Sequence, residues 1–162
     1  MTRESAVILL HELKTDSLIL TKRNESLRNH PGEFCFPGGM RDLKDQDLWS
    51  TALREVHEEL GIDSSRIACV KALKPEYTLL GKIIYPWLAT ISALQPYVMN
   101  KHEVSDVISL PMKEVSCRNN YKELCIEKAN KKIITCQYTA YPHLVWGATA
   151  RIMQQLCLDK KE

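Results

Sequence analysis

The sequence predicts an α/β fold, a mixed β-sheet covered by helices. Short β-rich runs stand before, between and after two segments with helical periodicity, and this alternation favours a sheet covered by helices. The chain has 162 residues and neither an internal repeat nor a low-complexity linker. We therefore expect one domain, residues 1–162, long enough to bury a sizeable core.

The N-terminal segment reads as two strands followed by a polar loop. Residues 5–13 and 17–23 are short β-rich runs separated by Lys-Thr-Asp, which is typical of a hairpin or strand pair. A polar loop follows over residues 24–33, and then the brief apolar run Phe-Cys-Phe at 34–36. We expect the Pro-Gly-Gly at 37–39 to break regular structure.

A helix is predicted from about Asp47 to Leu60. Its apolar residues recur at helical spacing and form one stripe, with Gly61 where a C-cap glycine belongs. The stripe consists of Trp49, Leu53, Val56 and Leu60, with Ala52 beside them.

The C-terminal half alternates strand-like runs with one further helix. Strands are predicted within 66–73, 82–91 and 103–111, the last ended by Pro111, and within 121–127 and 132–138, which flank a second hairpin turn. The final helix is predicted over residues 144–158, with four apolar residues in register: Val145, Ala148, Ile152 and Leu156.

The overall composition is that of an ordinary soluble globular protein. Hydrophobic residues make up 44% of the chain and charged residues 26%. A net charge of +2 is too mild to indicate a nucleic-acid partner or a membrane surface as partner. A phosphate-bearing small molecule is compatible with this charge, because local fields matter more at such a site.

Cysteine usage and the terminal sequences indicate a cytoplasmic protein. The six cysteines form no CxxC pair and no zinc-like spacing with the five histidines. The N-terminus does not read as a secretory signal, and no apolar run reaches the roughly 20 residues that cross a bilayer. Reduced core thiols are favoured, although Cys125 and Cys136 could face each other across the second hairpin.

Three glutamates share one side of the predicted helix. At about 100° per residue, Glu55, Glu58 and Glu59 fall within roughly 100° of helix surface. Carboxylates clustered on one rigid face suit Mg²⁺ or Mn²⁺, which prefer hard oxygen ligands. Arg54 can pair with Glu58 at i+4. On the glutamates alone, a solvated acidic face is the alternative.

The residues around these glutamates resemble the Nudix box, G-x5-E-x7-R-E-U-x-E-E-x-G-U, where U is a bulky aliphatic residue. The segment REVHEELGI matches every specified position of its second half. The matching residues are Arg54, Glu55, Val56, Glu58, Glu59, Gly61 and Ile62. The resemblance implies the Nudix fold, a mixed β-sheet sandwiched between helices in α/β/α layers. It also implies metal-dependent hydrolysis of a nucleoside diphosphate linked to another group.

The first half of the box departs from the general pattern. Gln46 stands at the position of the early glutamate, and Gly39 lies one residue too far upstream. Asp45 or Asp47 could supply a nearby carboxylate, or the early position is structural and Gln46 suffices.

The upstream stretch LILTKRNESLRNHPGEFCFPGG resembles the signature of the coenzyme A (CoA) diphosphatase subfamily. Asn24 falls where that subfamily prefers Ser or Ala, and the lengthened loop with Asp42 and Asp45 also fits the subfamily. The matching residues are Leu20, Thr21, Arg23, Arg28, Gly32, Phe36, Pro37, Gly38 and Gly39.

This second resemblance implies hydrolysis of CoA or acyl-CoA to 3′,5′-ADP and 4′-phosphopantetheine or its acyl derivative. Glu55, Glu59 and Glu58 are then the expected ligands of Mg²⁺ or Mn²⁺, and Glu58 or Glu103 the expected general base. The expected substrate-binding residues are Arg23, Arg28, Gly32, Phe36, Gly38 and Gly39.

Three points stay open on the sequence alone. Another nucleoside diphosphate derivative, such as ADP-ribose, a dinucleotide or a nucleoside triphosphate, is an alternative substrate. A non-catalytic nucleotide-binding Nudix module is a further alternative. A homodimer is compatible with the sequence, which does not determine the oligomeric state.

Overall fold

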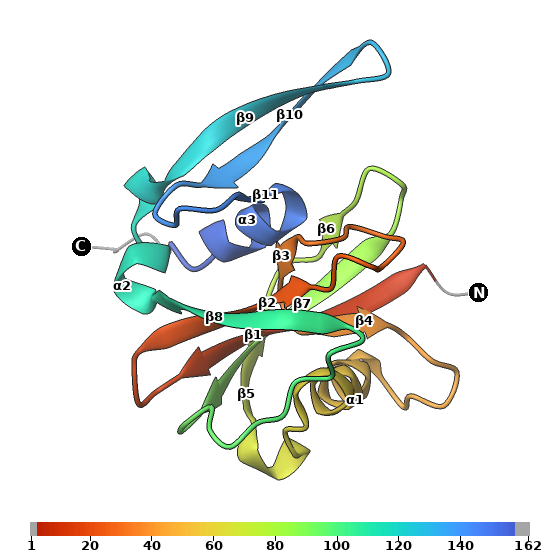
Figure 1. The fold of residues 1–162 in the computed structure, drawn as a ribbon, viewed down its shortest axis with the longest axis vertical. Coiled ribbons are helices and arrows are strands. Elements are labelled where there is room, and N and C mark those ends of the chain that lie inside the picture. Colours follow the sequence, from red (N-terminus) through yellow and green to blue (C-terminus); the bar gives the residue numbers. More distant parts are fainter. Residues whose placement is uncertain (1–2, 158–162) are drawn as a thin grey trace.

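The computed structural model describes residues 3–157, and within them the largest element is an eight-stranded sheet (Figure 1). Its main path runs β3-β2-β1-β7-β5, while β4 pairs with β1, β6 with β7 and β8 with β2. The strands are β1 (Glu4–Glu12), β2 (Ser17–Arg23), β3 (Phe34–Cys35), β4 (Gly38–Met40), β5 (Ala68–Ala72), β6 (Glu76–Tyr77), β7 (Ile83–Ile91) and β8 (Val104–Pro111).

A second, smaller sheet and three α-helices complete the described part of the chain. The small sheet has the order β11-β10-β9. Its strands are β9 (Tyr121–Lys128), β10 (Lys131–Tyr138) and β11 (Val145–Trp146). The helices are α1 (Leu48–Leu60), α2 (Met112–Val115) and α3 (Gly147–Gln154), with single 3₁₀ turns at η1 (Ser64–Arg66) and η2 (Arg118–Asn120).

The large sheet is mixed, as the sequence predicts. Strands β1 and β7 run parallel from the pair Glu4–Ile83 to the pair Glu12–Ile91, while the other pairings are antiparallel. A parallel neighbour on one side of β1 requires a long crossover connection. Helix α1 lies within that connection, and so the crossover carries the acidic helix across one face of the sheet.

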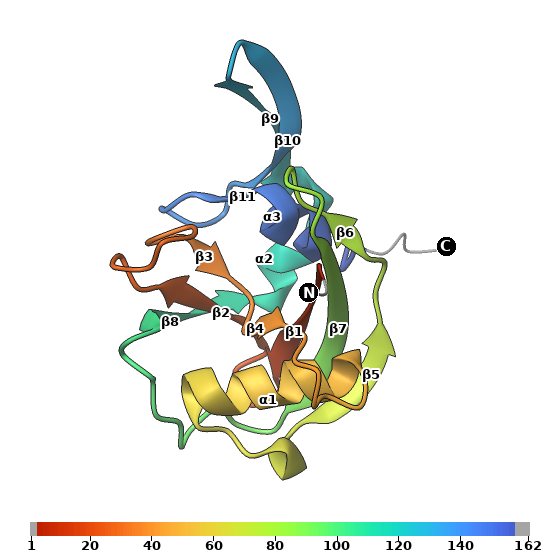
Figure 2. The ribbon, with the colours of Figure 1, turned by 90° about the vertical axis from the view of Figure 1, so that its right-hand side faces the viewer.

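Both faces of the sheet are buried. Successive side chains of a strand point to opposite faces, so Ile8 and Leu10 pack on the α1 side with Val56, whereas Leu9 packs on the other side. There it meets a cluster that includes Ile152 of α3. Figure 2 shows α1 on one side of the sheet and α2 and α3 on the other, which confirms the α/β/α arrangement.

The structure corrects two boundaries. The Pro-Gly-Gly segment does not end regular structure, because Gly38–Met40 pairs with β1 as the strand β4. The last helix begins at Gly147 and not at residue 144, because Val145–Trp146 pairs with β10 first. The predicted helix end at residue 158 lies outside the described residues. Strand β6 and helix α2 are too short for a periodic signal.

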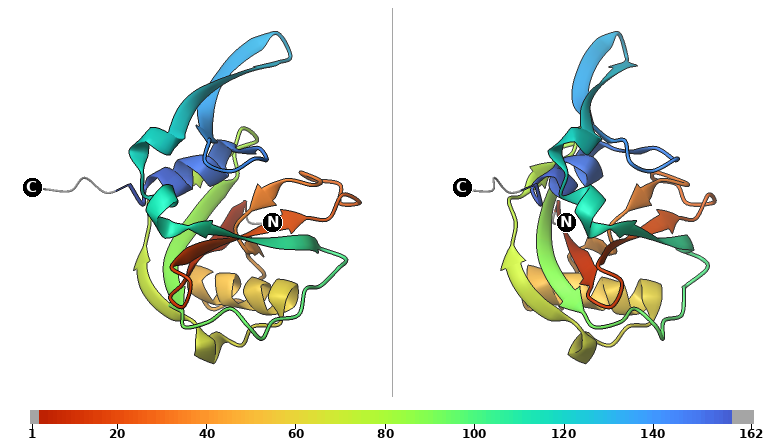
Figure 3. Two further views of the ribbon diagram at one scale, coloured as in Figure 1. Left: turned by 60° about the vertical axis from the view of Figure 1, so that its left-hand side comes forward. Right: turned by 90° about the vertical axis from the view of Figure 1, so that its left-hand side faces the viewer.

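The predicted second hairpin is confirmed and projects from the body of the molecule (Figure 3). Its turn residues Ala129 and Asn130 both have positive φ, which matches the right-handed twist of the flanking strands. In the β9–β10 register Cys125 faces Ile134, so Cys125 and Cys136 are not opposite one another. All six cysteines, which lie within residues 3–157, are free.

Within that same range no helix is long and apolar enough to cross a bilayer.

Candidate active site

Helix α1 begins and ends at residues suited to those positions. The Asp47 side chain accepts a hydrogen bond from the Ser50 N–H, which satisfies one of the free donors of the first turn. Gly61 adopts a left-handed conformation with φ 63° and donates its N–H to the His57 carbonyl. The helix between these caps is a rigid support for the glutamates, as predicted.

Three carboxylates converge beside α1. Oxygens of Glu55, Glu59 and Glu103 lie within 4.8 Å of one another. Glu55 and Glu59 are one helical turn apart, while Glu103 stands immediately before β8. These hard oxygen donors fit a divalent ion such as Mg²⁺ or Mn²⁺.

The segment before β8 is held against the C-terminal end of α1. The N–H of Asn100 donates to the Glu59 carbonyl at 2.8 Å, and the N–H of Val98 donates to the Leu60 carbonyl at 2.9 Å. These bonds occupy carbonyls that have no partner within the helix. They explain how Glu103, 44 residues after Glu59, comes to face the helix.

Burial and mutual repulsion raise the proton affinity of two of these carboxyls. Burial, followed by the nearby charges of Glu55 and Glu103, raises the pKa of Glu59 to about 8. Burial also raises the pKa of Glu55, against the lowering effect of Arg54. Clustered buried carboxylates with raised pKa values are the arrangement that a bound cation would relieve.

Arg54 links the acidic helix to the loop before it. Its guanidinium donates to both carboxylate oxygens of Asp45, at 2.9 and 3.0 Å, and to the Met40 carbonyl at 3.0 Å. Its Nη1 also lies 3.1 Å from one oxygen each of Glu55 and Glu58. The Arg54–Glu58 pair predicted at i,i+4 is therefore present, within a larger network.

Glu58 is placed differently from the other two glutamates of the helix. Its side chain is 46% exposed and paired with Arg54, whereas that of Glu55 is only 15% exposed. Among the described residues the converging carboxylates include Glu103 and not Glu58. Glu58 thus lies at the edge of the cluster.

The two loop aspartates considered near the early box position have other partners. Asp47 caps α1, and Asp45 binds Arg54 and accepts a hydrogen bond from Thr51 at 2.9 Å. The hydrogen bonds with Arg54 hold the pKa of Asp45 well below its usual range. Gln46 contributes its carbonyl, which accepts from Arg41 at 3.5 Å. This loop therefore supports the helix instead of adding a carboxylate to the cluster.

Gly38 and Gly39 lie in direct contact with the carboxylates. The N–H of Gly38 points at an oxygen of Glu59 at 3.4 Å. A Cβ placed on Gly39 would lie 2.5 Å from the carboxyl carbon of Glu55. The close approach of β4 to the helix side chains thus requires glycine here.

The segment of residues 23–36 brings only some of its predicted substrate-binding residues to the surface. Arg28 is exposed, while Arg23 is half-buried and donates through Nε to the Asn29 carbonyl at 3.0 Å. Gly32 has a positive φ of 67° and donates its N–H to the Arg23 carbonyl. The ring of Phe36 is only 4% exposed and packs within the core.

Asn24 anchors this loop to the segment that carries Glu103. Its N–H donates to the Glu103 carbonyl at 2.9 Å, and its side-chain amide donates to the Lys101 carbonyl at 2.6 Å. Its amide oxygen accepts from the N–H and hydroxyl of Ser26, both at 2.9 Å. The residue that departs from the CoA signature therefore has a defined structural role.

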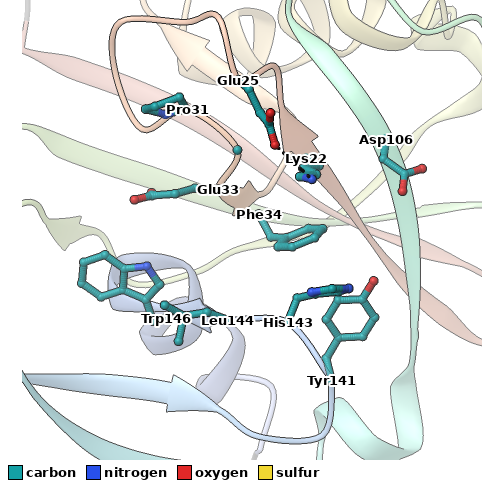
Figure 4. Close-up of a pocket in the computed structure, with 11 residues that line it drawn as sticks. Lys22, Glu25, Pro31, Glu33, Phe34, Asp106, Tyr141, His143, Leu144 and Trp146 are labelled. Carbon is teal, nitrogen blue, oxygen red and sulfur yellow. Dashed lines mark ion pairs between the residues drawn. The ribbon is translucent and has the colours of Figure 1, made fainter.

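A cleft of about 750 Å³ opens beside the same loop (Figure 4). One wall comes from residues 31–34, and the other from residues 141–146, which carry Tyr141, His143 and Trp146. Lys22 and Asp106 line it from the neighbouring strands β2 and β8. Sequence reasoning did not identify this second wall, although the aromatic-rich stretch YPHLVW was a visible signal.

Comparison with known families and curated relatives gives a consistent result. The model of the NUDIX domain family matches residues 1–133. A protein of Pectobacterium atrosepticum named "Uncharacterized Nudix hydrolase NudL" is 33% identical over 160 residues, covering 97% of this chain and 82% of its own length. A protein of the same name from Yersinia pestis is 34% identical over 142 residues, covering 86% of this chain and 70% of its own.

Solved structures share the fold at lower identity. An Ap4A hydrolase of C. elegans aligns with a TM-score of 0.56 and 18% identity over 67% of this chain and 80% of its own. The NUDIX domain of Shewanella oneidensis NrtR aligns with a TM-score of 0.53 and 22% identity, over 71% and 76% of the two chains. The family match, the curated relatives and the acidic helix agree: the chain belongs to the Nudix hydrolases, enzymes that act on phosphoric anhydride bonds of nucleoside diphosphate derivatives.

Proposed function

We propose that this Nudix hydrolase cleaves the diphosphate of CoA or acyl-CoA, with 3′,5′-ADP and 4′-phosphopantetheine or its acyl derivative as products. The observation that carries the proposal is that the signature loop and the carboxylate cluster are directly connected. The loop that bears the CoA-like signature is hydrogen-bonded through Asn24 to Glu103, a member of the carboxylate cluster. The residues that resemble a substrate signature therefore border the residues suited to a metal.

In this proposal Glu55 and Glu59 hold the divalent ion, Mg²⁺ or Mn²⁺. Both are on α1, both are largely buried, and their oxygens converge with that of Glu103. When bound, such an ion supplies Lewis acidity and neutralises charge on the diphosphate. The Gly38 N–H and the packing of Gly39 keep the two carboxylates in place.

Glu103 is assigned as the general base. It reaches the cluster from outside the helix, and its carboxylate can accept the proton of an attacking water at one of its oxygens. The water oxygen forms a bond to one phosphorus, the bond from that phosphorus to the bridging oxygen breaks, and the second phosphate leaves with the electron pair. Glu58 keeps its pairing with Arg54 and orients the guanidinium.

Arg28 and Arg23 are the proposed phosphate contacts. Arg28 is exposed on the signature loop, so its forked donors are available to phosphate oxygens. Within residues 3–157, Arg23 donates through Nε to the Asn29 carbonyl, and its terminal nitrogens are the proposed donors to the ligand. Phe36 contributes indirectly, as a buried support for the strand–loop junction.

A product assay tests the proposal. The enzyme is incubated with CoA, acetyl-CoA, ADP-ribose and NADH, each with Mg²⁺, with Mn²⁺ or with EDTA, and the products are separated by chromatography. We expect 3′,5′-ADP from the CoA series with either metal and none with EDTA. Release of AMP from ADP-ribose or NADH without turnover of CoA would overturn the CoA assignment and favour another nucleoside diphosphate derivative.

A further inference from the structure

The cleft beside the signature loop is lined by four aromatic rings, one of which has no ring partner in the described part of the chain. Phe34 packs edge-on against Tyr141, with ring centroids 5.6 Å apart, and stacks with His143 at a centroid distance of 6.0 Å. Phe34 and Tyr141 also pack against the core cluster. The half-buried Trp146 also lines the cleft but has no ring partner among residues 3–157. Figure 4 shows its indole set apart from the other three rings.

The charges around the cleft favour a ligand that donates hydrogen bonds. Glu25, Glu33 and Asp106 supply carboxylates, against the single ammonium of Lys22. That ammonium is already 3.7 Å from Glu25. One oxygen of Glu33 lies 3.1 Å from His30, which leaves the other available. A phosphate would be repelled here, whereas a ring bearing an amino group would find acceptors.

The cleft is close to the carboxylate cluster. Asp106 follows Glu103 by three residues on extended chain, which corresponds to roughly 10 Å. Asn24 fastens the start of the loop wall to the Glu103 carbonyl, and the Arg23 N–H donates to the Glu33 carbonyl at 2.9 Å. The separation of roughly 10 Å is about the length of a ribose and a phosphate, so one nucleotide can reach from the cleft to the carboxylate cluster.

We propose that this cleft binds the adenine base of the substrate, with the ring stacked on Trp146 and its exocyclic amine donating to Glu33. The proposal rests on the proposed function in assuming a nucleotide substrate, although it requires only an adenine nucleotide and not CoA in particular. The volume of about 750 Å³ is ample for a nucleoside. Trp146 lies beyond residue 133, where the family match ends, so this determinant is particular to the C-terminal part of the chain.

Equilibrium binding tests the stacking surface apart from catalysis. Calorimetric titration in metal-free buffer measures the affinity of the full chain for 3′,5′-ADP and for 4′-phosphopantetheine. We expect Trp146→Ala to weaken 3′,5′-ADP binding about 10-fold or more, in keeping with the usual value of a base–aromatic stack, and Trp146→Phe to restore most of it. Binding of 4′-phosphopantetheine should be unchanged in both variants.

A control lies directly after β1, in the turn that leads to the start of β2, whereas Lys22 lines the cleft near the end of β2. Leu13→Ala removes an exposed apolar side chain that does not line the cleft, and should leave both affinities unchanged. If Trp146→Ala weakens 4′-phosphopantetheine instead, the cleft holds the other arm of the substrate and the proposal is wrong. An equal affinity for 3′,5′-ADP in the wild type and in Trp146→Ala would also overturn it.

A second variant examines the polar contact without removing a large side chain. The inosine counterpart of 3′,5′-ADP carries a 6-oxo group in place of the amine. This oxygen is a hydrogen-bond acceptor, so the Glu33 carboxylate would repel it. We expect the wild type to prefer the adenine ligand at least several-fold and Glu33→Gln to reduce that preference, because an amide can donate to the oxo group. An unchanged preference in Glu33→Gln would contradict the assignment of Glu33. Failure of the proposed function can be told apart from failure of this proposal. If the product assay shows hydrolysis of ADP-ribose instead of CoA, the binding of the adenine nucleotide should still depend on Trp146 and Glu33.

Discussion

At the scale of single residues, the two adjacent glycines of β4 have different roles. Gly38 is needed for packing against β1, and Gly39 is needed for the position of Glu55 in the site. A Cβ on Gly38 would lie 2.3 Å from the carbonyl oxygen of Ala6, in the backbone of β1. A Cβ on Gly39 would instead meet the carboxylate of Glu55. A backbone strand cannot move aside cheaply, whereas a side chain can rotate.

We therefore expect two different outcomes from the same substitution. Gly39→Ala should reduce kcat at least about 10-fold by displacing Glu55, with a loss of stability below about 1.5 kcal/mol. Gly38→Ala should destabilise the protein by about 2 kcal/mol or more. Urea denaturation and steady-state kinetics of both variants measure this. If Gly39→Ala retains wild-type kcat, the position of Glu55 is not important for turnover.

Residue-level prediction from the sequence succeeded where local geometry decided the outcome. Glu55 and Glu59 are brought together by the helical repeat alone, as is the contact of Arg54 with Glu58. Glu103 was proposed only by resemblance, because its approach depends on the path of residues 98–103. The Asp45–Arg54 contact was not predicted, since it depends on how the intervening loop folds back onto the helix.

At the scale of elements, the loop of residues 41–47 is attached to helix α1 by an ion pair between Asp45 and Arg54. Arg54 binds both oxygens of Asp45, whose side chain is only 6% exposed. The same loop ends in the Asp47 cap of the helix. The lengthened loop is thus fastened at two points to the element that carries the glutamates.

Asp45→Asn should weaken this attachment in a pH-dependent way. We expect a loss of about 1–3 kcal/mol at pH 7, the usual range for a hydrogen bond to a charged partner. Because the pKa of Asp45 is lowered in the folded protein, its contribution is fully present above its ordinary pKa of 3.8 and is lost as the pH falls through the folded value. The difference between wild type and variant should therefore be constant from pH 5 to 8 and shrink below about pH 4.

Denaturant titrations at several pH values measure this difference, and Asp42→Asn provides a control in the same loop. The side chain of Asp42 is exposed and accepts a hydrogen bond from the Lys44 N–H. A difference for Asp45→Asn that stays unchanged down to pH 2 would contradict the assigned role of the charge.

Elements with strong periodic patterns were predicted well, and those defined by tertiary pairing were not. The bounds of α1 follow from Asp47, the apolar stripe and Gly61, all local signals. The start of α3 was predicted three residues too early, because the pairing of Val145 and Trp146 with β10 cannot be read from helical periodicity. The strand at Gly38–Met40 exists for a similar reason, since β1 supplies its partner.

At the scale of the whole molecule, the carboxylate cluster opposes the stability that the two apolar clusters provide. Glu55, Glu59 and Glu103 place like charges close together next to a buried helix face. Fold class and family were accessible from the sequence because they depend on patterning over the whole chain. The cleft was not, since its walls are more than 100 residues apart along the chain and meet only through the packing of the two sheets.

Divalent ions should consequently stabilise the whole protein through this cluster. At pH 8 we expect saturating Mg²⁺ or Mn²⁺ to raise the Tm of the wild type by roughly 5 °C or more, the shift that binding at about 100 times Kd produces in a domain of this size. Glu59→Gln should match or exceed the wild-type Tm in EDTA, because repulsion is reduced, and should gain little from the metal. Thermal denaturation followed by circular dichroism measures both values.

The matched control for this experiment is Glu58→Gln, which removes a carboxylate of the same helix from outside the converging set. It should keep most of the metal-dependent rise. An equal rise in Glu59→Gln and the wild type would place the ion elsewhere.

The projecting β9–β10 hairpin is a suitable place to attach a label to this enzyme. Its tip at Ala129 and Asn130 lies at the far end of a two-stranded ribbon, away from the core clusters on either face of the large sheet. A short peptide tag or a fluorophore attachment site introduced between these two residues would extend an existing turn without interrupting a buried strand. Such a probe could report on the protein in cells while the hydrolytic machinery is left intact.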